Sequence, residues 1–145
     1  MLGTIATVFA GIIGDIAVGI QSPIAGSMSQ RIGGSASSFV VHVSGAVFSG
    51  IVLVLRGGEQ LRNWKSLSWY MLASGVFGVI LYLTLSRTLS RLGADTAIAL
   101  IIVGQLLVGM LIDQLGLFGV VQRSMDLTKV LAAVLLMLGS YLMVR

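Results

Sequence analysis

The sequence predicts an all-α integral membrane protein, a bundle of five transmembrane helices forming a single membrane domain over residues 1–145. Three observations support this fold class. Hydrophobic residues make up 57% of the chain and charged residues only 10%, whereas a soluble domain carries about 25% charged residues. Five apolar runs each approach the roughly 20 residues that cross about 30 Å of hydrocarbon. None shows the alternation of barrel strands, so helices are expected to satisfy the backbone groups within lipid.

The predicted helices cover approximately residues 2–24, 36–55, 68–87, 95–114 and 127–144. Short glycine-containing connections separate them, and none is long enough for a second domain. The net charge of +4 arises mostly from basic residues between the runs, which is typical of membrane flanks rather than of a nucleic-acid surface. No Lys or Arg precedes Arg31, so we expect the first run to remain in the mature protein rather than to be cleaved.

The first helix is predicted to have a small, polar face opposite a bulky one. Gly11, Gly14, Asp15 and Gln21 lie on the polar arc at about 100° per residue, so this face should pack or line a cavity. A carboxylate within a bilayer is costly and usually functional, which makes Asp15 a candidate proton carrier or cation partner. The alternative is a structural carboxylate, either hydrogen-bonded in a packed interface or placed beside a water-filled vestibule. Gln21 is a candidate for contacting solute.

The second and third helices carry similar stripes, and the fifth helix reads as a packing element. His42 is a candidate proton relay, although a histidine bonded to a neighbouring serine or to the backbone is the simpler reading. Tyr82 is most simply a packing aromatic. The stripes, spaced by three or four residues, comprise Ser38, His42, Gly45 and Ser49 in the second helix and Ser74, Gly78 and Tyr82 in the third.

The fourth helix places Gln105, Gly109 and Asp113 on one side, at spacings of i, i+4 and i+8. Gln105 falls near the membrane midplane, where its amide needs either a solute or an interhelical hydrogen bond worth about 1 kcal/mol. Asp113 lies near the interface, where it either supports the site or tethers a loop. Asp95, at the helix start, is explained as a cap.

The charge distribution leaves two topologies open. With five spans, one side of the membrane receives five basic residues and the other receives four. This bias is small for the positive-inside rule, so the chain either inserts in both directions and forms an antiparallel homodimer, or keeps its N-terminus inside because of Arg62 and Lys65. The two sets are Arg56, Arg62, Lys65, Arg123 and Lys129, against Arg31, Arg87, Arg91 and Arg145.

One motif carries a family resemblance. The run Ile102-Val103-Gly104-Gln105, followed by Ile112-Asp113-Gln114-Leu115-Gly116-Leu117-Phe118-Gly119, resembles the YdcZ-like five-helix proteins of the drug/metabolite transporter superfamily. Gln21-Ser22-Pro23-Ile24, Trp69-Tyr70 and Leu92-Gly93-Ala94 match in the same order. Ala25 stands where the family often has Asn, and Asp15 and His42 lie outside its pattern. The resemblance covers essentially the whole chain.

The resemblance implies a small-molecule transporter, which is not an enzyme, in the inner membrane of a prokaryote. Together with the residues above, it predicts transport of a small polar or cationic solute by alternating access in a homodimer, with proton coupling as an option. The expected partners are membrane lipid, a second copy and the solute, with no nucleic acid, cofactor or metal. The rival functions are a dual-topology channel and a non-transporting accessory subunit. The predicted site residues are Asp15, Gln21, Gln105, His42 and Asp113, and the predicted packing glycines are Gly11, Gly14, Gly45, Gly78 and Gly109.

Overall fold

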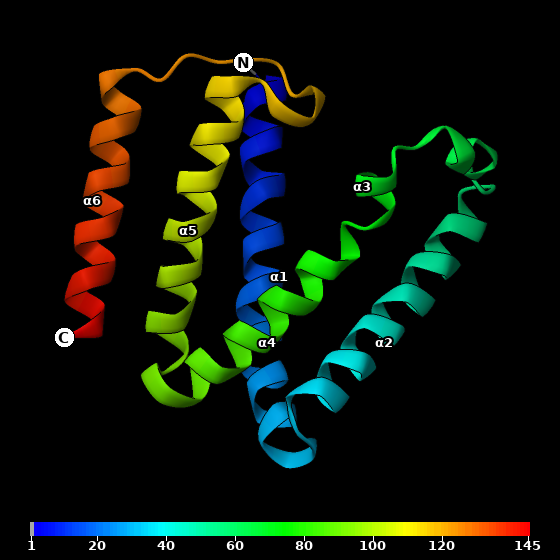
Figure 1. Ribbon diagram of the computed structural model, residues 1–145, viewed down its shortest axis with the longest axis horizontal. Helices are drawn as coiled ribbons and strands as arrows, with labels where there is room; N and C mark the ends of the chain where they lie inside the picture. Colours follow the sequence, from blue (N-terminus) through cyan, green and yellow to red (C-terminus); the bar gives the residue numbers. More distant parts are fainter. Residues whose placement is uncertain (1) are drawn as a thin grey trace. The chain divides into compact units, whose positions relative to one another are not determined.

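A computed structural model describes residues 2–145 and confirms the all-α class (Figure 1). Within these residues five helical spans are long and apolar enough to cross a membrane. The chain divides into two compact units, Met1–Arg87 and Thr88–Arg145, and the boundary falls inside one helix. The elements are α1 Leu2–Ile32, α2 Gly34–Leu55, η1 Leu61–Ser66, α3 Trp69–Leu72, α4 Gly75–Leu92, α5 Ala94–Leu115, η2 Leu117–Gly119 and α6 Leu127–Val144.

Helix α1 is longer than the apolar run that predicts it. The sequence expectation ends near residue 24, close to Pro23, but the helix continues to Ile32. Proline removes one backbone donor, and transmembrane helices tolerate that loss because other groups re-satisfy the freed carbonyl. The added turns include Ser27, Ser29, Gln30 and Arg31, so they are more polar than the apolar run before them. Gly33, at φ 87°, then reverses the chain into α2.

The third predicted helix, 68–87, is interrupted in the structure. It forms the short α3 and then α4, which continues to Leu92. At the break, Ser74 Oγ donates to the carbonyl of Met71 at 2.7 Å, a local bond that competes with helical pairing. Gly75 follows, and glycine is a weak helix former. Shorter-range backbone bonds bridge the gap, such as Phe77 N to Ser74 O at 3.1 Å.

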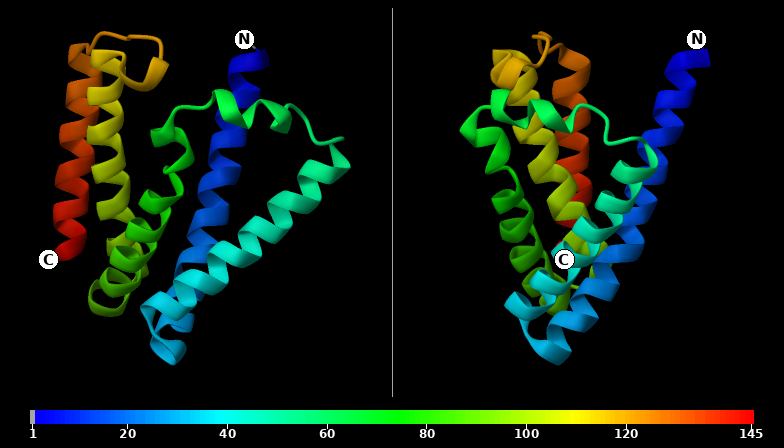
Figure 2. Two further views of the ribbon diagram at one scale, coloured as in Figure 1. Left: turned by 45° about the vertical axis from the view of Figure 1, so that its right-hand side comes forward. Right: turned by 90° about the vertical axis from the view of Figure 1, so that its right-hand side faces the viewer.

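The second unit contains α5 and α6, which lie side by side in both figures (Figure 2). Two side-chain bonds join these helices: Thr96 Oγ1 donates to Met143 O at 3.0 Å, and Ser140 Oγ donates to Ala99 O at 3.4 Å. At the start of α6, Asp126 caps the helix by accepting from Lys129 N at 2.8 Å.

Burial is inverted relative to a soluble protein. Most large apolar side chains are exposed, such as Phe9 at 62% and Phe48 at 68%. The buried positions are, apart from Leu85, small or hydroxyl-bearing, as with Ser37 at 0% and Ala97 at 0%. This arrangement suits a surrounding of lipid tails, where small interfacial residues let helix backbones approach closely.

Candidate functional site

The buried polar residues of the first unit gather where α1, α2 and α4 meet. In Figure 1, α1 and α2 come together at the Gly33 turn and diverge away from it. We call this junction the polar seam. Its buried residues are Ser22, Ala25, Ser37, Ser38, Tyr82 and Ser86.

Tyr82 ties α4 to α1 within the polar seam. Its side chain is buried, and its hydroxyl donates to the backbone carbonyl of Ala25 at 3.2 Å. A buried tyrosine hydroxyl normally requires such a partner. The interpretation of Tyr82 as a packing aromatic therefore missed its polar role, because the acceptor lies 57 residues away and is a backbone atom that the sequence does not mark.

His42 is half-buried in the same seam and is the predicted site residue with the most defined surroundings. Its Nδ1 lies 2.7 Å from the backbone carbonyl of Ser38 and 3.4 Å from Ser38 Oγ. A carbonyl can only accept, so Nδ1 carries the proton in that bond, and Nε2 of a neutral ring is left as an acceptor. The ring lies edge-on to Tyr82, with centroids 6.1 Å apart.

Gly78 makes room for the imidazole ring. A Cβ at this position would stand 3.2 Å from His42 Nε2, closer than ordinary van der Waals contact. The predicted stripes of α2 and of the third span therefore do face each other at this point. Beside the ring lies a hollow of about 250 Å³, lined by Ser35, Ser38, Phe39, His42, Val79 and Leu83. Its wall is mainly apolar, with the histidine as its titratable group.

The acidic and amide candidates lie outside the polar seam. Asp15 is exposed on α1, and its carboxylate makes no hydrogen bond or ion pair to any residue in the described range 2–145. Gln21 is exposed on α1, and Gln105 is exposed on α5. Asp113 is half-buried, and its backbone carbonyl accepts from Arg123 N at 2.8 Å. Their roles in binding stay predictions.

The loop after α5 is held by Gln114, a residue that the site prediction did not include. Gln114 Oε1 accepts from Met125 N at 2.7 Å, and its backbone carbonyl accepts from Gln122 Nε2 at 2.8 Å. The helix ends at Gly116, which adopts the left-handed conformation with φ 62°. The family-like motif around Gly116 therefore forms a helix end with a tethered loop. A glutamine two residues before a C-capping glycine was the available signal in the sequence.

The predicted packing glycines differ in their surroundings. Gly78 alone among the five meets a neighbouring side chain, while a Cβ at any of the others would find no atom within 4 Å in the part of the chain described. Their role in helix packing stays a prediction. No group of three or more potential metal-binding side chains occurs among residues 2–145. The four glycines with open surroundings are Gly11, Gly14, Gly45 and Gly109.

Comparison with known proteins identifies the family. Residues 3–142 match the model of a family described as "Putative inner membrane exporter, YdcZ". No curated protein and no solved structure matches the chain. The match confirms the predicted resemblance and a multi-pass location in the inner membrane, and it supports a membrane transporter in general. Since the match spans nearly every residue, the chain belongs to the YdcZ family of inner membrane proteins.

Proposed function

We propose that the protein exports a small polar or cationic solute by alternating access, working as a homodimer with Asp15 at the transport site. The observation that carries this proposal is the exposed Asp15 carboxylate within a membrane-spanning helix. Asp15 precedes the end of the apolar run near residue 24 by nine residues, or about 14 Å at 1.5 Å per residue. That distance is close to half of a 30 Å hydrocarbon core.

A carboxylate at this depth requires a polar neighbour. Placing an aspartate in lipid at a helix centre costs about 3 kcal/mol on insertion scales, and more in other treatments. Within residues 2–145 no side chain or backbone group donates a hydrogen bond to the Asp15 carboxylate, and no cation pairs with it. Water, a solute cation, a proton or a second copy of the chain can each meet this requirement. A cavity shared by two copies would supply all of them, which favours a transport site at a dimer interface.

The position of His42 in the polar seam, beside an interrupted helix, supports a role for it in transport. Its ring bridges α2 and α4, and α4 begins immediately after the break at Ser74. Discontinuous helices are typical of transporter sites. We propose that His42 binds and releases a proton during the transport cycle. Gln21 and Gln105 would contact the solute through their amides, and Asp113 would support the end of α5.

The decisive experiment measures flux of a panel of organic cations into proteoliposomes, comparing the wild type with Asp15→Asn. We expect saturable, proton-gradient-driven flux that falls at least tenfold in Asp15→Asn. Asp126→Asn is the matched control, because Asn preserves a helix N-cap, and it should transport within twofold of wild type.

Three results would contradict the proposal, each in a different way. Single-channel currents in planar bilayers would identify a channel, which needs a continuous wet path. Undiminished flux through a correctly assembled Asp15→Asn protein would show that the Asp15 carboxylate is not part of the transport site. Absence of flux for every cation, with intact assembly, would favour an accessory subunit.

A further inference from the structure

The segment between α2 and α3 contains a 3-10 helix with three distinct faces. In a 3-10 helix, side chains at i and i+3 eclipse one another because there are three residues per turn. Leu61 and Trp64 therefore share one edge of η1, Arg62 and Lys65 share a second, and Asn63 and Ser66 share the third. Each edge has a single chemical character: apolar, basic, or amide and hydroxyl.

We propose that η1 lies in the lipid headgroup layer and binds the phosphate of an anionic phospholipid between Arg62 and Lys65. The element connects the end of one membrane span, Leu55, to the start of the next, Trp69. Such a connection necessarily stands at a membrane–water interface. Lipid binding at η1 is separate from transport and independent of the identity of the solute.

Charge complementarity favours an anionic partner. Arg62 and Lys65 are both exposed, and neither forms an ion pair within residues 2–145. Three residues at about 2 Å rise separate their attachment points by about 6 Å, a spacing that lets both side chains reach one phosphate. The neighbouring Arg56 differs, because its guanidinium is 3.4 Å from the Glu59 carboxylate. The charge of Arg56 is therefore already partly compensated.

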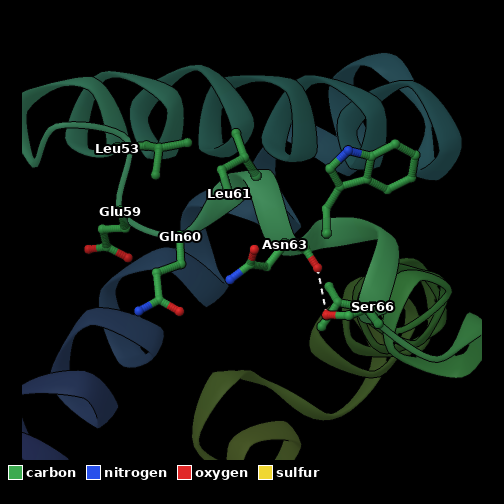
Figure 3. A pocket seen from close by; sticks show the side chains of 8 residues that line it. Leu53, Glu59, Gln60, Leu61, Asn63 and Ser66 are labelled. Atoms are coloured by element: carbon green, nitrogen blue, oxygen red, sulfur yellow. Dashed lines mark hydrogen bonds between the residues drawn. The ribbon is translucent and has the colours of Figure 1, made fainter.

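The apolar edge fixes the depth of the element. Leu61 is 58% exposed and Trp64 51% exposed, so each has part of its surface free for the acyl boundary. Figure 3 shows Leu61 directed toward Leu53 of α2, while the amides of Gln60 and Asn63 lie on the opposite side of η1. These residues line an open hollow of about 460 Å³. An amphipathic segment with these edges lies in the interface plane.

The two tryptophans of the chain, Trp64 and Trp69, both lie in or beside this segment. Intrinsic fluorescence therefore reports on this region without a label. The experiment uses a Trp69→Phe background, so that Trp64 is the sole emitter. The protein is reconstituted in mixtures of phosphatidylcholine and phosphatidylglycerol, with bromine on the acyl chains of one lipid at a time. Comparing the quenching of Trp64 by the two brominated lipids gives the preference for phosphatidylglycerol over phosphatidylcholine beside this residue.

Each basic residue near an anionic surface strengthens binding by about 1 kcal/mol, which is roughly fivefold. We therefore expect phosphatidylglycerol to be preferred by about 25-fold, and Arg62→Gln with Lys65→Gln to lower the preference to near one. Arg56→Gln should stay within twofold of the parent. The charge-conserving pair Arg62→Lys with Lys65→Arg should keep most of the preference, which separates charge from folding.

Equal quenching by both lipids in the parent protein would overturn the proposal. So would a preference that survives the double glutamine variant. Loss of the preference in millimolar inorganic phosphate, at constant ionic strength, would reassign the site to free phosphate and also overturn the lipid assignment.

Discussion

The contact between Gly78 and His42 yields the sharpest stability prediction. Replacing Gly78 by alanine adds a Cβ that would stand 3.2 Å from His42 Nε2. The ring has little freedom to retreat, because its Nδ1 is bonded to Ser38 O at 2.7 Å. Over-packing of this kind typically lowers the free energy of unfolding by about 1–3 kcal/mol, while exchanging glycine for alanine in a helix raises it by about 1 kcal/mol. The expected net loss is about 0–2 kcal/mol.

A double-mutant cycle isolates the steric part of this effect. When His42→Ala removes the ring, Gly78→Ala should become stabilising by about 1 kcal/mol, and its difference from the loss of about 0–2 kcal/mol with His42 present gives a coupling of about 1–3 kcal/mol. Unfolding in mixed micelles, followed by circular dichroism, measures each corner of the cycle. Gly50→Ala is the matched control, since a Cβ there meets nothing within 4 Å, and it should be neutral or stabilising. Equal effects of Gly78→Ala with and without His42 would refute the proposed contact.

Two further predictions test the bonds that the structure places at the seam and at the loop. Tyr82→Phe removes the 3.2 Å bond to Ala25 O and should lower the free energy of unfolding in micelles by about 1 kcal/mol; an unchanged value would argue against that bond. Gln114→Ala removes the 2.7 Å acceptor for Met125 N and should speed proteolytic cleavage within residues 116–126 several-fold, with Gln105→Ala unchanged as the control.

The helical spans could be predicted from sequence because hydrocarbon thickness and backbone pairing together restrict the chain to long apolar helices. The positions at which the helices end or break depend on local polar residues and hydrogen bonds instead. The extension of α1 beyond Pro23 mixes apolar residues with Ser27, Ser29, Gln30 and Arg31, so hydropathy marks it only weakly. At the break, Ser74 donates a side-chain bond to Met71 O, and hydropathy does not register such a bond. Contacts in the polar seam, such as the bond from the Tyr82 hydroxyl to Ala25 O, join residues far apart in the chain. The acceptor is a backbone atom, which the residue type at position 25 does not reveal. Spacing alone placed His42 and Gly78 on stripes but did not indicate that they touch.

The exposed face of α1 is a candidate interface between two antiparallel copies of the chain, and the symmetry of such a dimer provides a test. An antiparallel dimer has a two-fold axis in the membrane plane, so a residue at one depth maps to the mirror depth in its partner. Only residues near the midplane then lie opposite their own copies. Gly14 is ten residues before the end of the apolar run, or about 15 Å, and a Cβ there meets nothing within 4 Å.

The chain contains no cysteine, so single introduced thiols report cross-links without background. A disulfide forms only when two Cα atoms come within about 7 Å. If α1 lines an antiparallel interface, Gly14→Cys should give dimers on copper-phenanthroline oxidation, whereas Gly3→Cys, near the helix start, should not. Equal cross-linking at both positions would indicate a parallel pair instead. If neither position cross-links, residue 14 does not face its own copy across a two-fold axis, and that result contradicts an antiparallel pairing of α1 at this depth.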